Sequence, residues 1–217
     1  MLWHGRKHSL RLCAVLASVR PLRVYLRKHA LVRVAASRYV DGARLNGSLG
    51  NACVHSTSPD VSATCGQPDG PVAASDGPLR TDSPAYAHGL LSLRGTDAMH
   101  YVASEVWPRV GRAVLAALLV AAPLLEAYSD VSHMEGGTYR ASAVLAVDVL
   151  LTADGEPYIE EIHAPDGLMR TNPSGTRPPD GAAWERDAAR DALALLGVGG
   201  YPHRAEYDAS VTASVRA

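Results

Sequence analysis

Three residues with the chemistry of a metal or phosphate site, Asp148, Glu161 and His163, follow one another within a short stretch of the chain. They lie on two apolar runs that flank Asp154-Gly155, and Asp-Gly between such runs predicts a β-hairpin with a two-residue type I′ turn. In that register Asp148 faces Glu161, and His163 lies on the same side of its strand as Glu161 because side chains alternate. The sequence therefore predicts one polar face with two carboxylates and an imidazole.

Two facing carboxylates need a partner. Opposed residues of a hairpin have Cβ atoms roughly 5 Å apart, where two carboxylates repel by on the order of 3 kcal/mol at an effective dielectric of about 20. Either one carboxyl group keeps its proton, or a cation lies between the two, and a hard ion such as Mg2+ suits carboxylate, water and phosphate oxygens. An exposed hairpin with ordinary surface acids is the alternative, and a three-residue loop would remove the facing of Asp148 and Glu161.

Runs of β-forming residues near the N-terminus predict the start of an antiparallel sheet, with strands over 9–19, 22–26 and 30–35. Arg11 and Arg33 fall inside these strands, where an arginine is usually structural and half-solvated. Residues 51–58 predict a further short strand that ends in hydroxyl side chains, and His55 and Thr57 share a face of it. By residue type alone, such a histidine is a turn residue with satisfied hydrogen bonds.

The rest of the chain is predicted to be helical or irregular, which makes the fold class α+β. A helix is expected from an N-cap at Thr96-Asp97 to Leu125, broken or restarted at Pro108, and its nearly all-apolar second part should be buried against the sheet. A final helix is expected over 184–196. Residues 58–95 are rich in Pro, Gly, Ser and Asp, and this composition predicts a flexible insertion.

Charge is unevenly distributed along the chain. The formal net charge is −1, yet residues 1–44 hold ten Lys or Arg against one acid, Asp41. Such a basic segment attracts phosphate, nucleic acid or acidic peptide, although each residue alone also fits a solvated strand face. A nucleic-acid partner is not expected, because the segment lacks interleaved aromatic residues on which bases could stack.

Size, cysteine content and apolar runs limit the remaining possibilities. With 217 residues, 47% of them hydrophobic, the chain can bury a sizeable core and is expected to form one globular unit. Its cysteines are odd in number and lack metal-type spacing, which argues against a disulfide framework and for a reducing compartment. The apolar run 113–125 is too short to span a bilayer and contains Pro123, so no membrane span or membrane partner is expected.

Several motifs, taken in order, resemble those of the tubulin-tyrosine ligase family, whose catalytic domain has an ATP-grasp fold. The stretches that agree with the family in order and spacing are 5–11, 21–26, 31–35, 51–58, 147–151 and 158–165. The resemblance runs from Trp3 to Asn172 and corresponds to the second half of the family's catalytic domain. It implies an ATP-grasp-like antiparallel sheet flanked by helices over 1–200, with the N-terminal part of the fold missing, weak ATP binding by this chain alone, and a tail over 201–217.

The resemblance also implies an enzyme. This would be an ATP-dependent ligase that adds glutamate, glycine or tyrosine to a protein carboxylate through an acyl phosphate, with ATP and Mg2+ as cofactors. The implied acceptor is tubulin or another acidic protein tail, as for a tubulin polyglutamylase or tyrosine ligase, and the implied location is the cytoplasm and cytoskeleton, the cilium included. In phosphoryl transfer of this kind Mg2+ bridges the phosphates and arginines hold the spreading charge.

Position by position, the resemblance assigns roles to residues. Asp148, Glu161 and His163 match the metal-binding positions, which agrees with the chemistry deduced from the hairpin. Arg11 and Arg33 match arginines that bind phosphate and stabilise the acyl-phosphate and tetrahedral states. The remaining matches, to the nucleotide and substrate pocket, are Lys7, His55 and Thr57.

Three departures from the family pattern bear on activity. His163 stands where the family has Asn, and imidazole suits transition metals better than Mg2+. Ser9 replaces an Asp and Ser58 an Asn, and each change removes a polar contact expected at the site. These departures support an alternative, in which the chain is an inactive fragment or pseudoenzyme that acts as a binding module for acidic tubulin tails.

Overall fold

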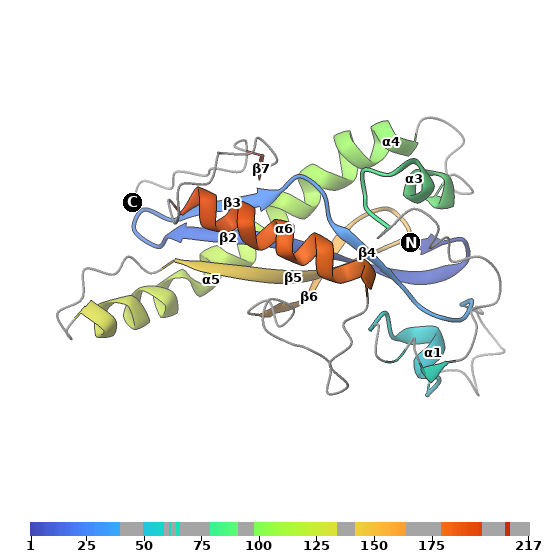
Figure 1. Ribbon diagram of the computed structural model, residues 1–217, viewed down its shortest axis with the longest axis horizontal. Helices are drawn as coiled ribbons and strands as arrows, with labels where there is room; N and C mark the ends of the chain where they lie inside the picture. The colour runs from blue at the N-terminus through green and yellow to red at the C-terminus, as the bar shows by residue number, and fades with distance from the viewer. Residues whose placement is uncertain are drawn as a thin grey trace. The chain divides into compact units, whose positions relative to one another are not determined.

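The computed structural model describes residues 1–39, 50–58, 61, 64–65, 79–90, 98–133, 142–163, 179–196 and 207–208, and in them the chain is α+β, as predicted (Figure 1). The strands are β1 (Leu2–Trp3), β2 (Arg6–Ser18), β3 (Arg23–Arg27), β4 (Leu31–Val34), β5 (Ala143–Leu151), β6 (Pro157–His163) and β7 (Tyr207–Asp208). The helices are α1 (Ala52–His55), α3 (Pro84–Leu90), α4 (Ala98–Tyr101), the π-helix η3 (Val102–Val106), α5 (Trp107–His133) and α6 (Pro179–Leu195).

The long strand β2 is the centre of the sheet. The described strands form a 7-stranded sheet with the order β6-β5-β2-β3-β7, and β1 and β4 also pair with β2. β4 pairs antiparallel with the first part of β2, where Ser9 lies opposite Arg33, and β3 pairs antiparallel with the last part, where Val15 lies opposite Tyr25. Most residues of β2 are buried, as expected for a central strand. The antiparallel sheet predicted from the N-terminal runs is therefore confirmed.

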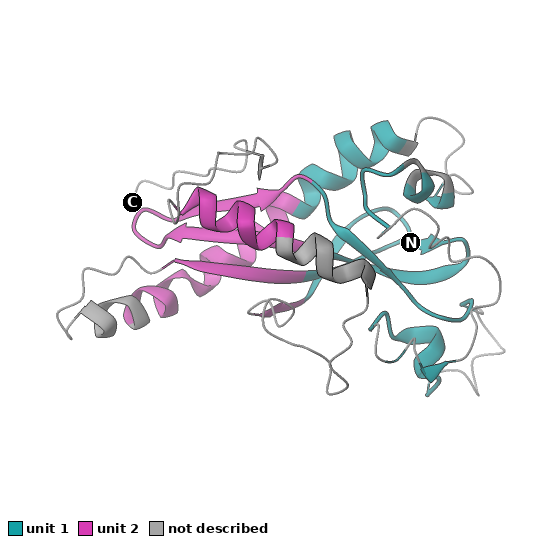
Figure 2. Cartoon of the chain, viewed as in Figure 1, with its two compact units in different colours: residues 1–11, 29–110, 148–160 teal, residues 12–28, 111–147, 161–217 magenta. Residues whose placement is uncertain are grey.

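The chain clusters into two compact units, which Figure 2 distinguishes by colour. Unit 1 consists of Met1–Arg11, His29–Val110 and Asp148–Glu160, and unit 2 of Leu12–Lys28, Gly111–Val147 and Glu161–Ala217.

Unit 1 includes a helix that the sequence did not predict. α3 lies within the stretch expected to be a flexible insertion, yet its Tyr86 is fully buried. The helix is tied to the N-terminal turn, because the His4 N–H donates a hydrogen bond to the Gly89 carbonyl at 3.2 Å. One buried aromatic side chain in an otherwise polar stretch leaves no periodic signal, which is why the helix was missed.

Unit 2 has a small core under the last helix. Val15 of β2 and Ala192 of α6 are fully buried and are packed by the side chains of Tyr25, Val144, Leu195 and Leu196. Beside this core the guanidinium of Arg27 lies 3.4 Å from the Asp191 carboxylate, and both side chains are buried. The predicted final helix is confirmed, and it begins earlier than expected, at Pro179.

The predicted interruption at Pro108 is confirmed, but it is a π-helical turn followed by a new α-helix rather than a gap in the helical path. α4, η3 and α5 follow one another without a gap, and Pro108 lies inside the helical path. Proline lacks the N–H that an α-helix requires and crowds the carbonyl four residues earlier. A π-helical turn directly before it relieves this conflict, because the Trp107 N–H donates to the Val102 carbonyl, five residues back. The predicted N-cap, Thr96-Asp97, lies outside the described residues.

α5 buries one stripe of its surface rather than most of it. Val110, Val114 and Leu118 repeat every four residues and are buried, whereas Val120 is 82% and Leu124 71% exposed. The expectation that this helix is buried on most faces is therefore wrong. By length and composition, the helical stretch Met99–Ala127 could span a membrane, a property shared by core helices of soluble proteins.

Residues 51–58 form a helical turn instead of the predicted strand. The Asn51 side chain accepts a hydrogen bond from the Cys53 N–H at 3.0 Å and thereby caps α1. Asn is among the strongest N-cap residues, and here that local preference outweighs the β-forming residues that follow.

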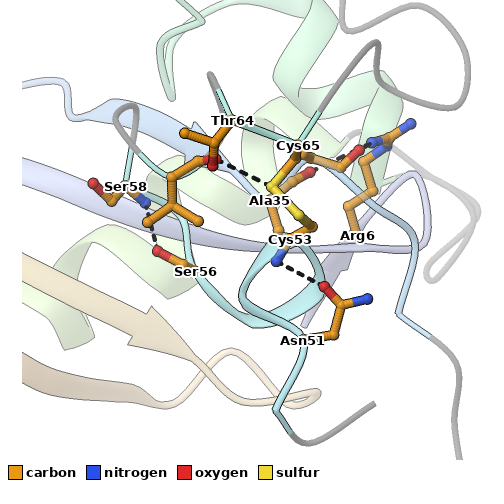
Figure 3. Close-up of a disulfide and its surroundings, with 10 residues drawn as sticks. Arg6, Ala35, Asn51, Cys53, Ser56, Ser58, Thr64 and Cys65 are labelled. Atoms are coloured by element: carbon orange, nitrogen blue, oxygen red, sulfur yellow. Dashed lines mark hydrogen bonds between the residues drawn. A yellow bond between two sulfur atoms is a disulfide. The ribbon is translucent and has the colours of Figure 1, made fainter. Parts of the chain in front are cut away.

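One disulfide is present, although the odd cysteine count was expected to go with a chain without a disulfide framework. Cys53 is bonded to Cys65, 12 residues further along the chain (Figure 3), and Cys13 lies buried in β2 outside this bridge. An odd cysteine count excludes complete pairing, but it leaves room for one bridge and one buried thiol.

Candidate active site

The predicted β5–β6 hairpin is present, but its turn differs from the predicted one. The Gly155 N–H donates to the Thr152 carbonyl at 3.0 Å, and the Thr152 N–H donates to the Glu156 carbonyl at 2.9 Å. Gly155 has a φ of 78°, whereas Asp154 is not among the described non-glycine residues with positive φ. A type I′ turn requires positive φ at both central residues, so the loop is a three-residue one that ends in a left-handed glycine. The two-residue loop is therefore wrong, although the closeness of Asp148 and Glu161 that was deduced from it is present.

The turn is held from outside by residues that the sequence did not single out. The Arg109 guanidinium donates to the Asp154 carbonyl at 3.1 Å and to the Glu156 carboxylate at 2.9 Å, and the Tyr101 hydroxyl donates to the Asp154 carbonyl at 3.2 Å. The N-terminal ammonium donates to the Leu151 carbonyl at 2.6 Å. These bonds fix the hairpin that carries Asp148.

Asp148 is held between the two predicted catalytic arginines. The Arg11 Nε donates to one carboxylate oxygen of Asp148 at 2.6 Å, and Nη2 of Arg11 donates to the other. The Arg33 guanidinium lies 3.7 Å from the same carboxylate. The three side chains are only 10–15% exposed. Fork-to-carboxylate pairing of this kind is the most directional of ion pairs, so it sets the orientation of both charged groups.

The same face of β2 carries two more polar contacts. Lys7, Ser9 and Arg11 alternate along the strand and therefore share a side. The Lys7 ammonium donates to Nδ1 of His55 at 2.8 Å, and the Ser9 hydroxyl lies 2.7 Å from the Thr57 hydroxyl. We call these side chains of β2, each with a partner from elsewhere in unit 1, the β2 ladder.

Lys7 has an aromatic neighbour that the sequence did not single out. Its ammonium lies 4.8 Å from the centre of the Tyr39 ring, which packs edge-on to His55 at 6.1 Å. An ammonium over a ring face is attracted by the ring's electron density. Because an ammonium can only donate, Nδ1 of His55 is the acceptor in this contact.

The remaining predicted metal ligands lie at the end of β6, where Glu161 is exposed and His163 half-buried. Asp148, Glu161 and His163 each offer one ligand atom, and these atoms lie within 4.8 Å of one another. The two carboxylates fit a hard cation such as Mg2+, while the imidazole fits it less well than an amide oxygen would. Asp148 would have to share its oxygens between the cation and Arg11.

An antiparallel α+β sheet whose central strand presents lysine and arginine side chains on one face is ATP-grasp-like, which is the fold the resemblance implied. The sequence model of the tubulin-tyrosine ligase family matches residues 1–171. The chain therefore belongs to the tubulin-tyrosine ligase family. Membership places it in the general class of tubulin-tyrosine-ligase-like ATP-grasp ligases. No curated protein matches the chain.

Proposed function

We propose that the chain acts in an ATP-dependent ligase that joins an amino acid to a carboxylate of an acidic protein. The β2 ladder carries this proposal, because it aligns Lys7 and Arg11 on one strand face with Arg33 on the adjacent strand. In the reaction a protein carboxylate oxygen attacks the γ-phosphorus of ATP, ADP leaves, and an acyl phosphate forms. The amine of the amino acid then attacks the acyl carbon, loses a proton and displaces inorganic phosphate.

Arg11 and Arg33 are proposed to be the catalytic residues. Both are cations that cannot lose their charge near neutral pH, and the Asp148 carboxylate orients them before any substrate binds. Two fixed guanidinium groups suit the equatorial oxygens of a phosphoryl group in transfer, where charge is spread over several atoms. Preorganisation of this kind lowers the barrier because no dipole must reorient as charge develops.

Lys7, His55 and Thr57 are proposed to bind the nucleotide. Lys7 supplies a positive charge, and Nδ1 of His55 accepts a hydrogen bond from its ammonium, which positions the ammonium without cancelling its charge. Thr57 is held beside Ser9 on the same strand face. Asp148, Glu161 and His163 are proposed to hold Mg2+, which when bound neutralises charge on the phosphates.

The acceptor is proposed to be tubulin or another acidic protein tail. Family membership supports tubulin, and the ten basic residues of segment 1–44 suit an acidic partner by charge. We propose glutamate, glycine or tyrosine as the amino acid that is added, and the cytoplasm and cytoskeleton as the location. Both proposals rest on family membership alone.

The first experiment is a calorimetric titration of the chain with Mg-ATP. We expect saturable binding that is lost when Asp148→Asn and Glu161→Gln are combined. Glu160→Gln is the matched control, because Glu160 is the exposed neighbour of Glu161 on β6 and should bind as the native chain does. Circular dichroism of each variant establishes that it is folded. Absence of binding to the folded native chain would contradict the proposal for this chain on its own.

One observation favours a second function. Arg11 occupies both oxygens of Asp148, and Ser9 pairs with Thr57 where the family pattern has an acid in place of Ser9. A site closed on itself in this way suits a binding module for acidic tails that uses no nucleotide. Binding of an acidic peptide without ATP, unchanged in Asp148→Asn, would support this function, and absence of such binding at low salt would rule it out.

A further inference from the structure

We propose that Cys53 and Cys65 form a reversible redox pair that controls α1 and, through it, the Lys7–His55 contact. The oxidised pair holds α1 in the form described above, and a dithiol reductant, small or protein-borne, releases it. This inference deepens the proposed function, since it assigns regulation to the proposed nucleotide site and rests on it for the effect on ATP.

The bridge joins α1 to the chain around residue 65. Figure 3 shows Cys53 and Cys65 meeting beside Arg6 and Ala35, with the Asn51 cap on the other side of Cys53. The two Cα atoms lie 5.6 Å apart. The bridge thus closes a loop from Cys53 to Cys65, and His55 and Thr57 lie in the first part of that loop.

Among the described residues, α1 is otherwise held by one buried side chain and a few hydrogen bonds. It is one turn long, Val54 is its only buried residue, and its end is closed by the Ser56 N–H donating to the Ala52 carbonyl at 2.8 Å. The Ser37 N–H donates to the Cys53 carbonyl at 2.8 Å. A single helical turn is unfavourable by itself, because nucleation fixes several residues for one hydrogen bond. A covalent tie at Cys53 therefore contributes a large share of the order of this turn.

The same turn positions the proposed nucleotide ligands. His55 follows Cys53 by two residues and accepts the hydrogen bond from Lys7, and Thr57 follows by four and contacts Ser9. If α1 frays, His55 moves away from Lys7, whose ammonium then loses the group that orients it. Reduction should therefore loosen the nucleotide end of the β2 ladder and leave the Arg11–Asp148 pair in place.

The bridge is accessible to a reductant. Cys53 and Cys65 are both half-buried, whereas Cys13 is only 5% exposed and cannot exchange readily. A thiolate of the dithiol attacks one sulfur and forms a mixed disulfide, and its second thiol then releases that sulfur. The protein gains two electrons and two protons, and the dithiol becomes a disulfide. In the reducing compartment proposed for this chain, disulfides are mainly transient and regulatory.

The test compares the full-length chain oxidised and after reduction with dithiothreitol, with thiols counted by mass spectrometry. The readouts are the ring ¹⁵N shifts of His55 and the affinity for Mg-ATP. We expect the His55 shifts to change on reduction and the affinity to fall by about fivefold or more, the lower end of usual coupling between sites. Cys53→Ser with Cys65→Ser should match the reduced chain and ignore dithiothreitol, while Cys13→Ser should respond as the native chain does.

The outcomes of this test distinguish a regulatory redox pair from a bridge with a general structural role. His55 shifts that are identical in both redox states would overturn the inference, as would loss of the whole fold on reduction, which would make the bridge a general structural one. Shifts that change on reduction while neither state binds Mg-ATP would support the redox pair and contradict the proposed nucleotide site.

Discussion

His8 and Tyr86 form a buried polar pair in unit 1. Nε2 of His8 lies 3.1 Å from the Tyr86 hydroxyl, and the rings meet edge to face at 5.7 Å. Burial, with a smaller contribution from the positive N-terminus, lowers the pKa of His8 to about 3, and burial raises the pKa of Tyr86. Both groups are therefore uncharged over the whole physiological range.

This pair predicts acid sensitivity of the fold. Unfolded His8 binds a proton below its ordinary pKa of 6.5, whereas folded His8 does so only near pH 3. Between these values the unfolded state binds more protons, so the free energy of unfolding should fall by roughly 1 kcal/mol per pH unit as the pH drops. Urea unfolding at a series of pH values measures this slope.

The matched variant combines His8→Phe with Tyr86→Phe, because a single change would leave the other polar group buried without its partner. Its stability should depend less steeply on pH between 6.5 and about 3. Identical slopes for the native chain and the double variant would show that His8 titrates normally in the fold.

The carboxylate of Asp148 is expected to matter for stability as well as for function. Asp148→Asn leaves the guanidinium of Arg11 without its carboxylate in a site where both side chains are nearly buried. Removing one member of such a pair should cost about 3 kcal/mol, while Glu161→Gln at an exposed position should change stability by less than about 0.5 kcal/mol. Both are measured by urea unfolding in metal-free buffer, and equal effects would contradict the orienting role of the Arg11–Asp148 pair.

At the scale of elements, the β5–β6 turn depends on the glycine that closes it. A Cβ on Gly155 would lie 2.6 Å from the Tyr101 hydroxyl, and φ is 78°; Gly5 has a similar φ of 74° but nothing within 4 Å. Gly5→Ala should therefore cost about 1 kcal/mol of backbone strain, and Gly155→Ala about 2 kcal/mol or more.

Thermal unfolding of both alanine variants tests whether Gly155→Ala destabilises the fold more than Gly5→Ala does. Tyr101→Phe removes the atom that a Cβ at Gly155 would meet, so Gly155→Ala should cost less in that background, a coupling that a double-mutant cycle isolates. Equal costs at Gly5 and Gly155 would mean that the turn moves freely away from Tyr101.

Strand and helix positions in this chain could be predicted from the sequence, but the local geometry that joins them could not. The N-terminal strands, the hairpin and the last helix follow from runs of apolar residues. The loop of the hairpin depends on Arg109 and Tyr101, which are distant in sequence. A π-turn before Pro108 and the cap at Asn51 are likewise set by single hydrogen bonds that no periodic pattern encodes.

For the candidate site, the sequence predicted residue types better than partners. The resemblance singled out Lys7, Arg11, Arg33 and Asp148, and alternation places the first two on one strand face. It treated the arginines and Asp148 as ligands of different groups, whereas in the structure they bind one another. Tyr39 left no signal at all, because its links to the site are ring contacts, with the Lys7 ammonium and edge-on with His55, that no sequence pattern encodes.

On the scale of the whole molecule, charge distribution should decide which partners bind. Four described basic residues of segment 1–44 are exposed, namely Arg20, which is paired with Glu126, and Arg23, Lys28 and Arg38. Because exposed charges are screened at ionic strengths near 0.15 M, where the Debye length is about 8 Å, binding of an acidic peptide through them must weaken as salt is added.

We therefore expect the affinity for a poly-glutamate peptide to fall steadily between low and high salt, and to fall further when Arg23, Lys28 and Arg38 are changed to Glu. Arg112→Glu with Arg190→Glu is the control, since both arginines are exposed, lie outside the basic segment and change the net charge in the same direction. Fluorescence anisotropy at several salt concentrations measures both effects. If the control weakens binding as much per reversed charge as the three-residue variant, net charge alone attracts the peptide and the basic segment is not a docking surface. If only the segment variant weakens binding, these three basic residues contribute specifically to binding of the acidic tail, as the proposed acceptor requires.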